Sequence, residues 1–382
     1  MLSLQQNRTI LLFIAALLFF TFTVASQNAS AQSGRTMPRP TPTPQEREPQ
    51  EPIRVFTEEV RLPIFITDSQ GRFDPTLELE DIIVLEDDEM QEVRSMRRIP
   101  ANVILVLDTS GGINPAMRTN TTRDVALALI SAFKPGDQLA VMQAGDRVET
   151  LQPWTSDTEG LKKVLKTKLS SGRRKRVSEA LIEAARQLKN QPAGSRHVVL
   201  ITDGVEPSGT SYLEAVRQLN AAQATVYVIS YTAMGREAIK SINSGVVWGG
   251  PPPRTANDTA READPTIPVP RPNINIATID TDKEMRRKRK EYSDATLKSE
   301  ERLTILAEET GGRILLPMSE AEMLREGREV ARDIGAQYVV TYKPKRPLAS
   351  SKAGEYRRIK VGLRRQGLTV RSRSGYTVPA QQ

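Results

Sequence analysis

The chain has 382 residues, 38% of them hydrophobic and 26% charged, a length that suits about two folded domains of ~150 residues each. Lys and Arg outnumber Asp and Glu by 54 to 46, and the net charge of +8 favours acidic partners, while 5% aromatic residues are too few for a platform that stacks nucleic-acid bases. There is no cysteine and only one histidine, which excludes disulfides, thiolate metal sites and mechanisms that need two imidazoles.

The N-terminal segment is typical of a secretory signal peptide. One arginine precedes an apolar run at residues 10–24, and Ala29-Ser30-Ala31 supplies a small-residue cleavage pattern. We expect residues 1–31 to be removed and the rest to be exported to the periplasm, the cell surface or the medium. The alternative is an uncleaved anchor that contacts the membrane, although the run is shorter than the ~20 residues of a membrane span. Residues 32–52 are rich in Pro, Thr, Gln and Glu, which predicts a disordered linker.

Residues 53–100 show the alternation of apolar and polar residues that is typical of short β-strands. Strands are predicted at residues 54–68, 82–85 and 93–98, with a turn at residues 69–72. A β unit of this size buries little by itself, so it needs another element to pack against.

Residues 101–335 alternate strands and helices. This order predicts a doubly wound, mostly parallel sheet that is covered by helices on both faces. The strands are expected at residues 102–107, 138–143, 147–154 (an edge strand), 197–202, 225–231 and 313–316, and the helices at 119–133, 158–169, 177–189, 211–222, 297–309 and 319–334.

A proline-rich and then highly charged stretch interrupts this alternation at residues 241–295, and we expect it to be a disordered insertion. Its basic run at residues 286–290 either binds an anionic surface or is solvated charge on flexible chain. Residues 336–378 again alternate as strands, at 337–342, 356–364 and 368–373. The order β, α/β, β predicts an α/β domain flanked by an antiparallel β domain in which residues 53–100 pair with residues 336–378.

The stretch at residues 102–112 is the place where function is expected. A buried strand opens there into Asp108, Thr109, Ser110 and two glycines. Parallel sheets place their sites at the carboxyl ends of strands, and this loop offers carboxylate and hydroxyl oxygens of the kind that hard cations bind.

These residues, together with Asp203-Gly204 after a later aliphatic strand, resemble the von Willebrand factor type A (VWFA) family. The surroundings resemble more particularly the VWFA-related domain of acidobacterial secreted proteins. The shared motifs are Gly71-Arg72, the acidic stretch from Glu86 to Gln91, Thr310-Gly311-Gly312-Arg313, Gln337-Tyr338, Tyr342-Lys343-Pro344 and the closing Gly375-Tyr376.

The resemblance implies adhesion through a metal-ion-dependent site, in which serines, a threonine and two acids hold Mg²⁺ or Mn²⁺ for an acidic group of the partner. The chain departs from this pattern at two positions, because Gly112 replaces the second serine and Lys175 takes the place of the threonine. Asp108, Ser110 and Asp203 remain as metal ligands, so the resemblance implies an incomplete site. We therefore expect no bound cofactor, although Mg²⁺ or Mn²⁺ is the ion that such a site would take. Ser171 or Ser178 would restore a ligand if the loop were shifted.

Two interpretations of Lys175 stay open. Its charge either replaces the cation beside Asp108 and Asp203, or it belongs to a solvated basic loop at residues 173–176. In both cases we expect binding of an acidic side chain of another protein, and no nucleic acid. The expected binding residues are Asp108, Thr109, Ser110, Gly112, Lys175 and Asp203.

The sequence predicts no enzyme. Ser110 would need a base to act as a nucleophile. The single histidine, His197, is the first residue of a strand that runs toward the site, so it lies at the end of that strand opposite to the site. The expected function is therefore protein–protein interaction or adhesion. The alternative is a structural envelope component whose VWFA-like domain has lost its ligand site.

Overall fold

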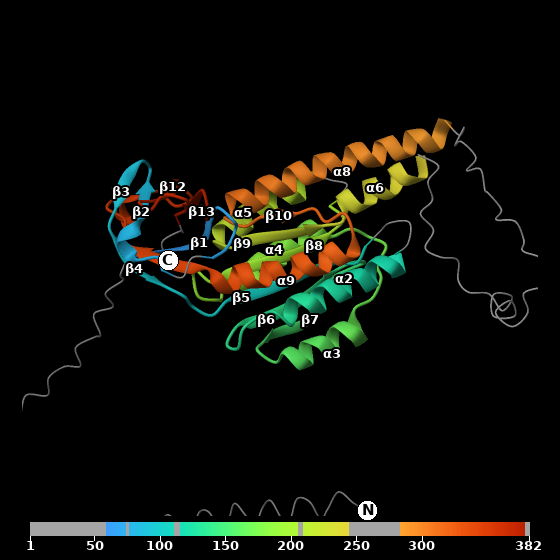
Figure 1. Ribbon diagram of the computed structural model, residues 1–382, viewed down its shortest axis with the longest axis horizontal. Coiled ribbons are helices and arrows are strands. Elements are labelled where there is room, and N and C mark those ends of the chain that lie inside the picture. Colours follow the sequence, from blue (N-terminus) through green and yellow to red (C-terminus); the bar gives the residue numbers. More distant parts are fainter. Residues whose placement is uncertain (1–58, 74–75, 111–114, 205–208, 244–282, 379–382) are drawn as a thin grey trace, which may run out of the picture. The chain divides into compact units, whose positions relative to one another are not determined.

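A computed structural model describes residues 59–73, 76–110, 115–204, 209–243 and 283–378 (Figure 1). The predicted signal peptide and linker, as well as Gly111 and Gly112, lie outside the described residues. Within the described ranges, no helix is both long and apolar enough to span a membrane.

The central sheet, as far as the chain is described, has six strands in the order β10-β9-β8-β5-β6-β7. Neighbouring strands are parallel except for β7, which pairs antiparallel with β6 at one edge. This confirms the predicted mostly parallel sheet. The strands are β5 (Asn102–Asp108), β6 (Gln138–Ala144), β7 (Val148–Thr155), β8 (Arg196–Thr202), β9 (Thr225–Ser230) and β10 (Ile314–Leu315).

Helices cover both faces of this sheet because alternate residues of its strands point to opposite sides. Val103, Leu105 and Leu107 pack in one apolar cluster with α2, α3 and α9, whereas Ile104 and Val106 pack in a second cluster with α4, α5 and α8. The first three helices thus cover one face of the sheet and the other three cover the opposite face (Figure 1). The helices are α2 (Pro115–Ile130), α3 (Thr158–Lys168), α4 (Val177–Leu188), α5 (Gly209–Ala221), α6 (Thr232–Asn243), α8 (Lys283–Glu309) and α9 (Glu320–Ala336).

Two four-stranded antiparallel sheets are formed by the described residues on either side of the α/β region in the sequence. Strands from before that region pair with strands from after it: β1 with β11 and β13, and β2 with β12. The two sheets, in the orders β13-β1-β11-β4 and β14-β12-β2-β3, share one apolar cluster. Their strands are β1 (Val60–Asp68), β2 (Ile82–Glu86), β3 (Glu89–Gln91), β4 (Val93–Arg97), β11 (Tyr338–Tyr342), β12 (Tyr356–Leu363), β13 (Leu368–Ser372) and β14 (Gly375–Thr377).

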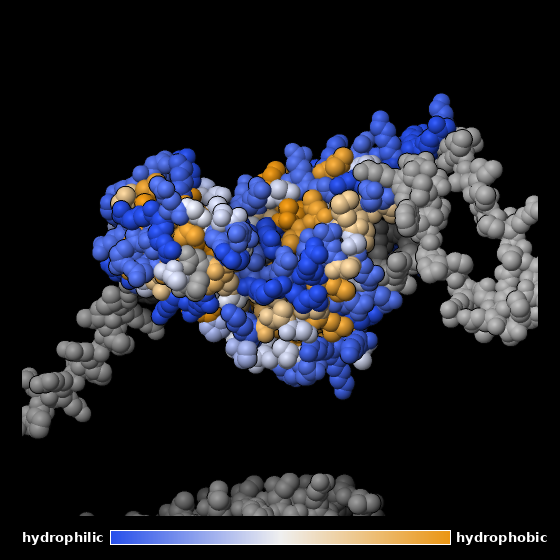
Figure 2. All heavy atoms as spheres, viewed as in Figure 1, coloured by the Kyte–Doolittle hydropathy of each residue, from blue (hydrophilic) through white to orange (hydrophobic). Residues whose placement is uncertain are grey.

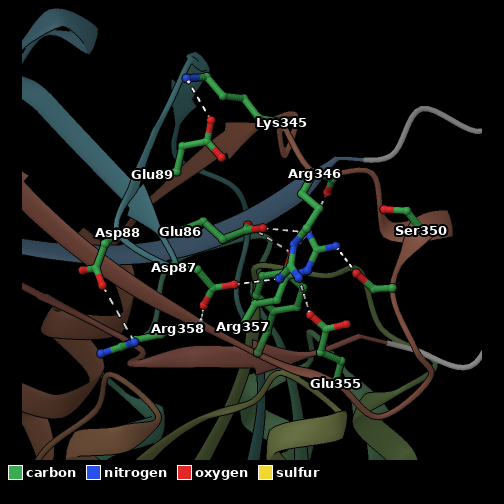
Figure 3. Close-up of polar contacts among 12 residues, drawn as sticks. Glu86, Asp87, Asp88, Glu89, Lys345, Arg346, Ser350, Glu355, Arg357 and Arg358 are labelled. Atoms are coloured by element: carbon green, nitrogen blue, oxygen red, sulfur yellow. Dashed lines mark hydrogen bonds and ion pairs between the residues drawn. The ribbon is translucent and has the colours of Figure 1, made fainter.

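We call this pair of sheets the β-sandwich, and an ion pair lies at its centre. The Arg357 guanidinium donates to Glu86 Oε1 at 2.6 Å, and the two side chains are 0% and 3% exposed (Figure 3). Glu86 Oε2 also accepts hydrogen bonds from the hydroxyls of Tyr342 (2.7 Å) and Tyr376 (3.1 Å). The pair therefore connects β2, β11, β12 and β14, which belong to both sheets.

The prediction that residues 241–295 are disordered is wrong at both of its ends. Residues 241–243 complete α6, and residues 283–295 belong to α8, a helix of 27 residues. Ion pairs one turn apart, such as Lys288 with Glu284, support the exposed start of α8. Farther along, α8 packs against α6, where Arg236 pairs with the buried Glu300. Residues 244–282 lie outside the described residues.

The surface seen in Figure 2 is hydrophilic over the β-sandwich and along the beginning of α8, where the basic run lies. Apolar side chains gather between α8 and α9, over β10 (Figure 2). The segment that follows β10 supplies two exposed apolar residues, Leu316 and Met318. The basic run is thus presented to solvent on a helix, which replaces the predicted flexible chain.

Candidate functional site

The predicted site lies at the carboxyl edge of the parallel strands. Asp108 is the last residue of β5, and Asp203 directly follows the last residue of β8, which is Thr202. Because β5 and β8 are neighbouring parallel strands, their ends meet at the same edge. The structure therefore brings Asp108, Ser110 and Asp203 together as the sequence predicts, while Gly112 lies outside the described residues.

Asp108 is held by a ring of donors. Its Oδ1 accepts hydrogen bonds from the Ser110 backbone N–H (3.0 Å) and hydroxyl (2.5 Å), and its Oδ2 accepts one from the Thr202 hydroxyl (2.7 Å). Burial, reinforced by the charge of Asp203, raises the pKa of Asp108, and the positive charge of Lys175 opposes this rise. The carboxyl group is thus buried beside a second acid and needs a compensating cation.

Lys175 supplies a positive charge at this point. Its ammonium group donates to Asp203 Oδ1, and the side chains of Lys175 and Asp203 are only 15% and 4% exposed. The ion pair is therefore largely sheltered from solvent and weakly screened. This position agrees with the first of the two interpretations of Lys175, in which its charge neutralises the acids.

The loop that carries Lys175 is fixed by close backbone packing. A Cβ atom on Gly172 would lie 2.8 Å from Gly145 Cα, so only glycine allows the two loops to approach this closely. The Gly172 N–H donates to Thr109 O at 3.0 Å, and the Asp146 carboxylate accepts the N–H groups of Arg173 (2.8 Å) and Arg174 (3.1 Å). These bonds lower the pKa of Asp146 and set the direction in which the basic loop leaves the sheet.

The sequence did not indicate three residues that organise this edge. Gln143 donates to Thr109 Oγ1 (3.0 Å) and to Ser170 O (2.7 Å). It therefore connects β6 to the loop that follows β5 and to the loop between α3 and α4. Thr202 orients Asp108, and Asp146, which lies two residues after β6, orients the basic loop. All three lie at or just beyond the carboxyl end of a sheet strand, which is the signal that would have identified them.

These residues do not fit a divalent cation in their present arrangement. Among the described residues, no group of three or more His, Cys, Asp or Glu side chains is placed to hold a metal ion. Lys175 takes an Asp203 oxygen, and an ammonium group repels a metal ion and has no lone pair to offer. Of the two alternative serines, Ser171 has its hydroxyl 3.1 Å from that of Thr119, and Ser178 is fully buried within α4.

His197 lies at the opposite end of β8 from Asp203, as predicted, and it is 2% exposed. Its ring packs near Tyr227, and within the described ranges its Nδ1 atom has no hydrogen-bond partner. Burial, together with the charge of Arg373, lowers the pKa of His197 to about 3. It is therefore a neutral core residue too far along the strand to serve Ser110 as a base.

The neutral His197 predicts a loss of stability in mild acid. Below its unfolded-state pKa of ~6.5, only the unfolded chain binds the proton, so the free energy of unfolding falls as the pH decreases toward 3. Between pH 7.5 and 5, we expect the wild type to lose about 2 kcal/mol more than the His197→Gln variant in urea unfolding. The single imidazole signal in NMR spectra should stay neutral throughout this range, and a titration midpoint near 6.5 in the folded chain would contradict the prediction.

Comparison with known proteins gives one family match. Residues 102–248 match the model of the von Willebrand factor type A domain. A search of curated proteins found no significant match.

Solved structures that resemble the chain include three described here. The von Willebrand factor type A protein from Catenulispora acidiphila is 10% identical, with a TM-score of 0.41 and coverage of 85% of this chain and 74% of that one. The conserved hypothetical protein BatB from Bacteroides thetaiotaomicron is 25% identical, with a TM-score of 0.29 and coverage of 34% and 66%. The manganese-loaded TRAP protein from Plasmodium vivax is 17% identical, with a TM-score of 0.32 and coverage of 36% and 61%.

The chain thus spans 66% of the BatB structure and 61% of the TRAP structure. The family match begins at Asn102, the first residue of β5, and includes the edge that carries Asp108, Lys175 and Asp203. Over residues 102–248 the chain is thus similar to the von Willebrand factor type A domain, the family that the sequence resembles.

Proposed function

We propose that this is an exported, non-enzymatic protein that binds another protein through the loops at the carboxyl edge of its parallel sheet, without full metal coordination. The Lys175–Asp203 ion pair carries the proposal, because it places a fixed positive charge where the family places a cation. The edge can therefore attract an acidic group with its own side chains. VWFA domains are generally interaction modules, and the family match therefore supports the proposal that this chain binds another protein.

The groups that face a partner belong to the basic loop. Arg173 and Arg174 are exposed, and among the described residues neither guanidinium has an ion pair, while their backbone N–H groups are anchored on Asp146. Two exposed guanidinium groups on a fixed backbone suit bidentate recognition of carboxylates. We therefore infer that the partner contributes an aspartate or glutamate.

The second candidate is a structural envelope component whose edge no longer binds a ligand. The observation that favours it is the same ion pair, since Lys175 satisfies Asp203 internally and leaves Asp108 and Asp203 closed to an incoming group. The two candidates differ in whether Arg173 and Arg174 contribute to binding.

Replacement of both exposed arginines tests this difference. We expect Arg173→Ser/Arg174→Ser to weaken binding to acidic peptides at least about tenfold, or about 1.4 kcal/mol, without changing the urea midpoint. The measurement is biolayer interferometry against a peptide library in which every Asp and Glu has an amide counterpart.

The matched control is Lys166→Ser/Lys168→Ser, which removes the same charge from exposed positions on α3. If both double variants bind as the wild type does, or if the amide peptides bind equally well, the proposed role of the loop is wrong. If no acidic peptide binds the wild type, the structural role is favoured.

A further inference from the structure

Two arginines of the β-sandwich lack partners within the described part of the chain. Arg61 on β1 is half-buried and Arg97 on β4 is exposed, and neither side chain makes a hydrogen bond or an ion pair with another described residue. Arg346, Arg357 and Arg358, by contrast, are all paired with acids (Figure 3). The half-buried Arg61 guanidinium has no counter-charge among the described residues, so an anion beside it would be favourable.

The strand register places these two arginines on the same face of one sheet. Arg61 lies opposite Thr341 and Arg97 lies opposite Val339, and both of these residues belong to the middle strand β11. Because residues two apart on a strand point to the same side, the arginines flank β11 from its two sides. Standard strand spacing puts their Cα atoms ~12 Å apart, a gap across which two arginine side chains can reach one small ligand.

A cavity of about 300 Å³ opens between the two arginines. Its lining residues come from β1, β4, β11, the connection from β4 to the start of β5, and the loop that precedes β8: Arg61, Arg97, Ile99, Pro100, Asn102, Pro192, Ser195, Val339 and Thr341. The loop that precedes β8 packs closely against the sheet at Gly194. A Cβ atom at this position would lie 2.8 Å from Val339 Cγ1 and 3.2 Å from Arg61 Cβ.

The other polar groups of the loop wall are already satisfied. Asn102 Nδ2 donates to Ser195 Oγ at 2.7 Å, and Ser195 Oγ donates to Pro192 O at 3.1 Å. The remaining charge in the lining is positive, and Ile99, Pro100, Pro192 and Val339 add apolar surface. The cavity therefore combines two fork-shaped donors with apolar walls.

We propose that this cavity binds a small oxyanion, a carboxylate or phosphate group on a short apolar stem, between the guanidiniums of Arg61 and Arg97. Each guanidinium donates two parallel hydrogen bonds to an oxyanion, and a dianion engages both arginines at once. The apolar walls cover the stem, and a volume of this size is at the lower end of small-molecule pockets. The site is separate from the Lys175–Asp203 edge and does not depend on the proposed function.

Thermal unfolding of the full chain tests this proposal. The probes are glutarate and inorganic phosphate, and each is compared with sodium chloride at equal ionic strength. A ligand that binds only the folded chain raises the unfolding midpoint in a saturable way. We expect such a rise with at least one probe, and glutarate and phosphate distinguish a dicarboxylate from a phosphate ligand. Arg61→Gln and Arg97→Gln should each raise the apparent Kd at least tenfold by calorimetry.

Arg94→Gln is the matched control, because Arg94 is exposed on the same strand as Arg97 but does not line the cavity. It should bind the probe as the wild type does. The proposal is overturned if neither probe gives a saturable effect, or if Arg94→Gln weakens binding as much as Arg97→Gln. Glutamine keeps the Cβ atom and the backbone pairing of each arginine and removes a charge that has no counter-charge among the described residues, so without the probe both variants should unfold at or slightly above the wild-type midpoint.

Discussion

Replacement of Glu86 by alanine is expected to lower the free energy of unfolding by about 3–5 kcal/mol, the cost of removing one partner from a buried ion pair. Arg357 is 0% exposed and would keep its charge, with the carbonyl groups of Arg346 and Pro347 and the hydroxyls of Ser351 and Tyr376 as its remaining partners. Burial lowers the pKa of Arg357, but the hydrogen bonds and charge of Glu86 and Tyr376 outweigh it and raise the pKa overall. In the variant the Glu86 contribution is lost, but an arginine guanidinium keeps its proton in proteins, so Arg357 cannot avoid the penalty by becoming neutral.

Denaturant unfolding checks this expectation, with Glu89→Ala as the control. Glu89 lies three residues along the same hairpin, and its ion pair with Lys345 is exposed (Figure 3), so its loss should cost less than about 1 kcal/mol. The double variant Glu86→Leu/Arg357→Met should recover most of the lost stability, because no uncompensated charge remains. Equal midpoints for Glu86→Ala and Glu89→Ala would show that the buried network does not stabilise the sandwich.

Gly312→Ala should destabilise the chain by about 3 kcal/mol or more, at the upper end of the cost of overpacking. A Cβ atom at this position would lie 1.9 Å from the Val226 carbonyl oxygen, which is backbone of the central sheet and cannot move aside alone. Gly312 also closes the end of α8, since its N–H donates to Ala307 O at 2.8 Å while Gly311 N–H donates to Glu308 O at 3.0 Å. The substitution would therefore displace β10 from β9 or open the end of the helix.

The control for this change is Gly362→Ala on β12, where a new Cβ atom would meet only Ile83 Cβ, at 3.9 Å. That variant should unfold within about 1 kcal/mol of the wild type, since alanine there mainly restricts the unfolded chain. Thermal or urea unfolding of the two variants measures the difference. A wild-type midpoint for Gly312→Ala would contradict the close packing of this turn on β9.

Local patterns in the sequence predicted most of the α/β region correctly. Residues 102–107 form a continuous aliphatic run, and a strand buried on both faces needs such a run, so β5 and the site at its end follow directly. The end of α8 could also be predicted, because Thr310-Gly311-Gly312 contains a glycine of the kind that ends a helix with a positive φ angle. In the structure, Gly311 has a φ angle of +81°.

The beginning of α8 could not be predicted from the local sequence. Residues 283–293 carry a run of like charges, which by itself favours flexible chain, and the predicted disorder was wrong here. Contacts with α6 decide the outcome, because the Arg236–Glu300 ion pair and the close approach of Tyr292 to Gly235 bring the two helices together. The residues concerned are 57–64 positions apart, so no local window contains the reason.

The sequence alone determined the parallel sheet, the position of Asp108 and Asp203 at its carboxyl edge, and the far placement of His197. These features follow from hydrophobic period and from the fixed direction of parallel strands. Only the tertiary structure decided which acid Lys175 pairs with, that Asp146 anchors the loop beside it, and that Arg61 and Arg97 share a cavity. Such contacts join residues that are 27 or more positions apart, and their geometry depends on how loops and sheets pack after the chain has folded.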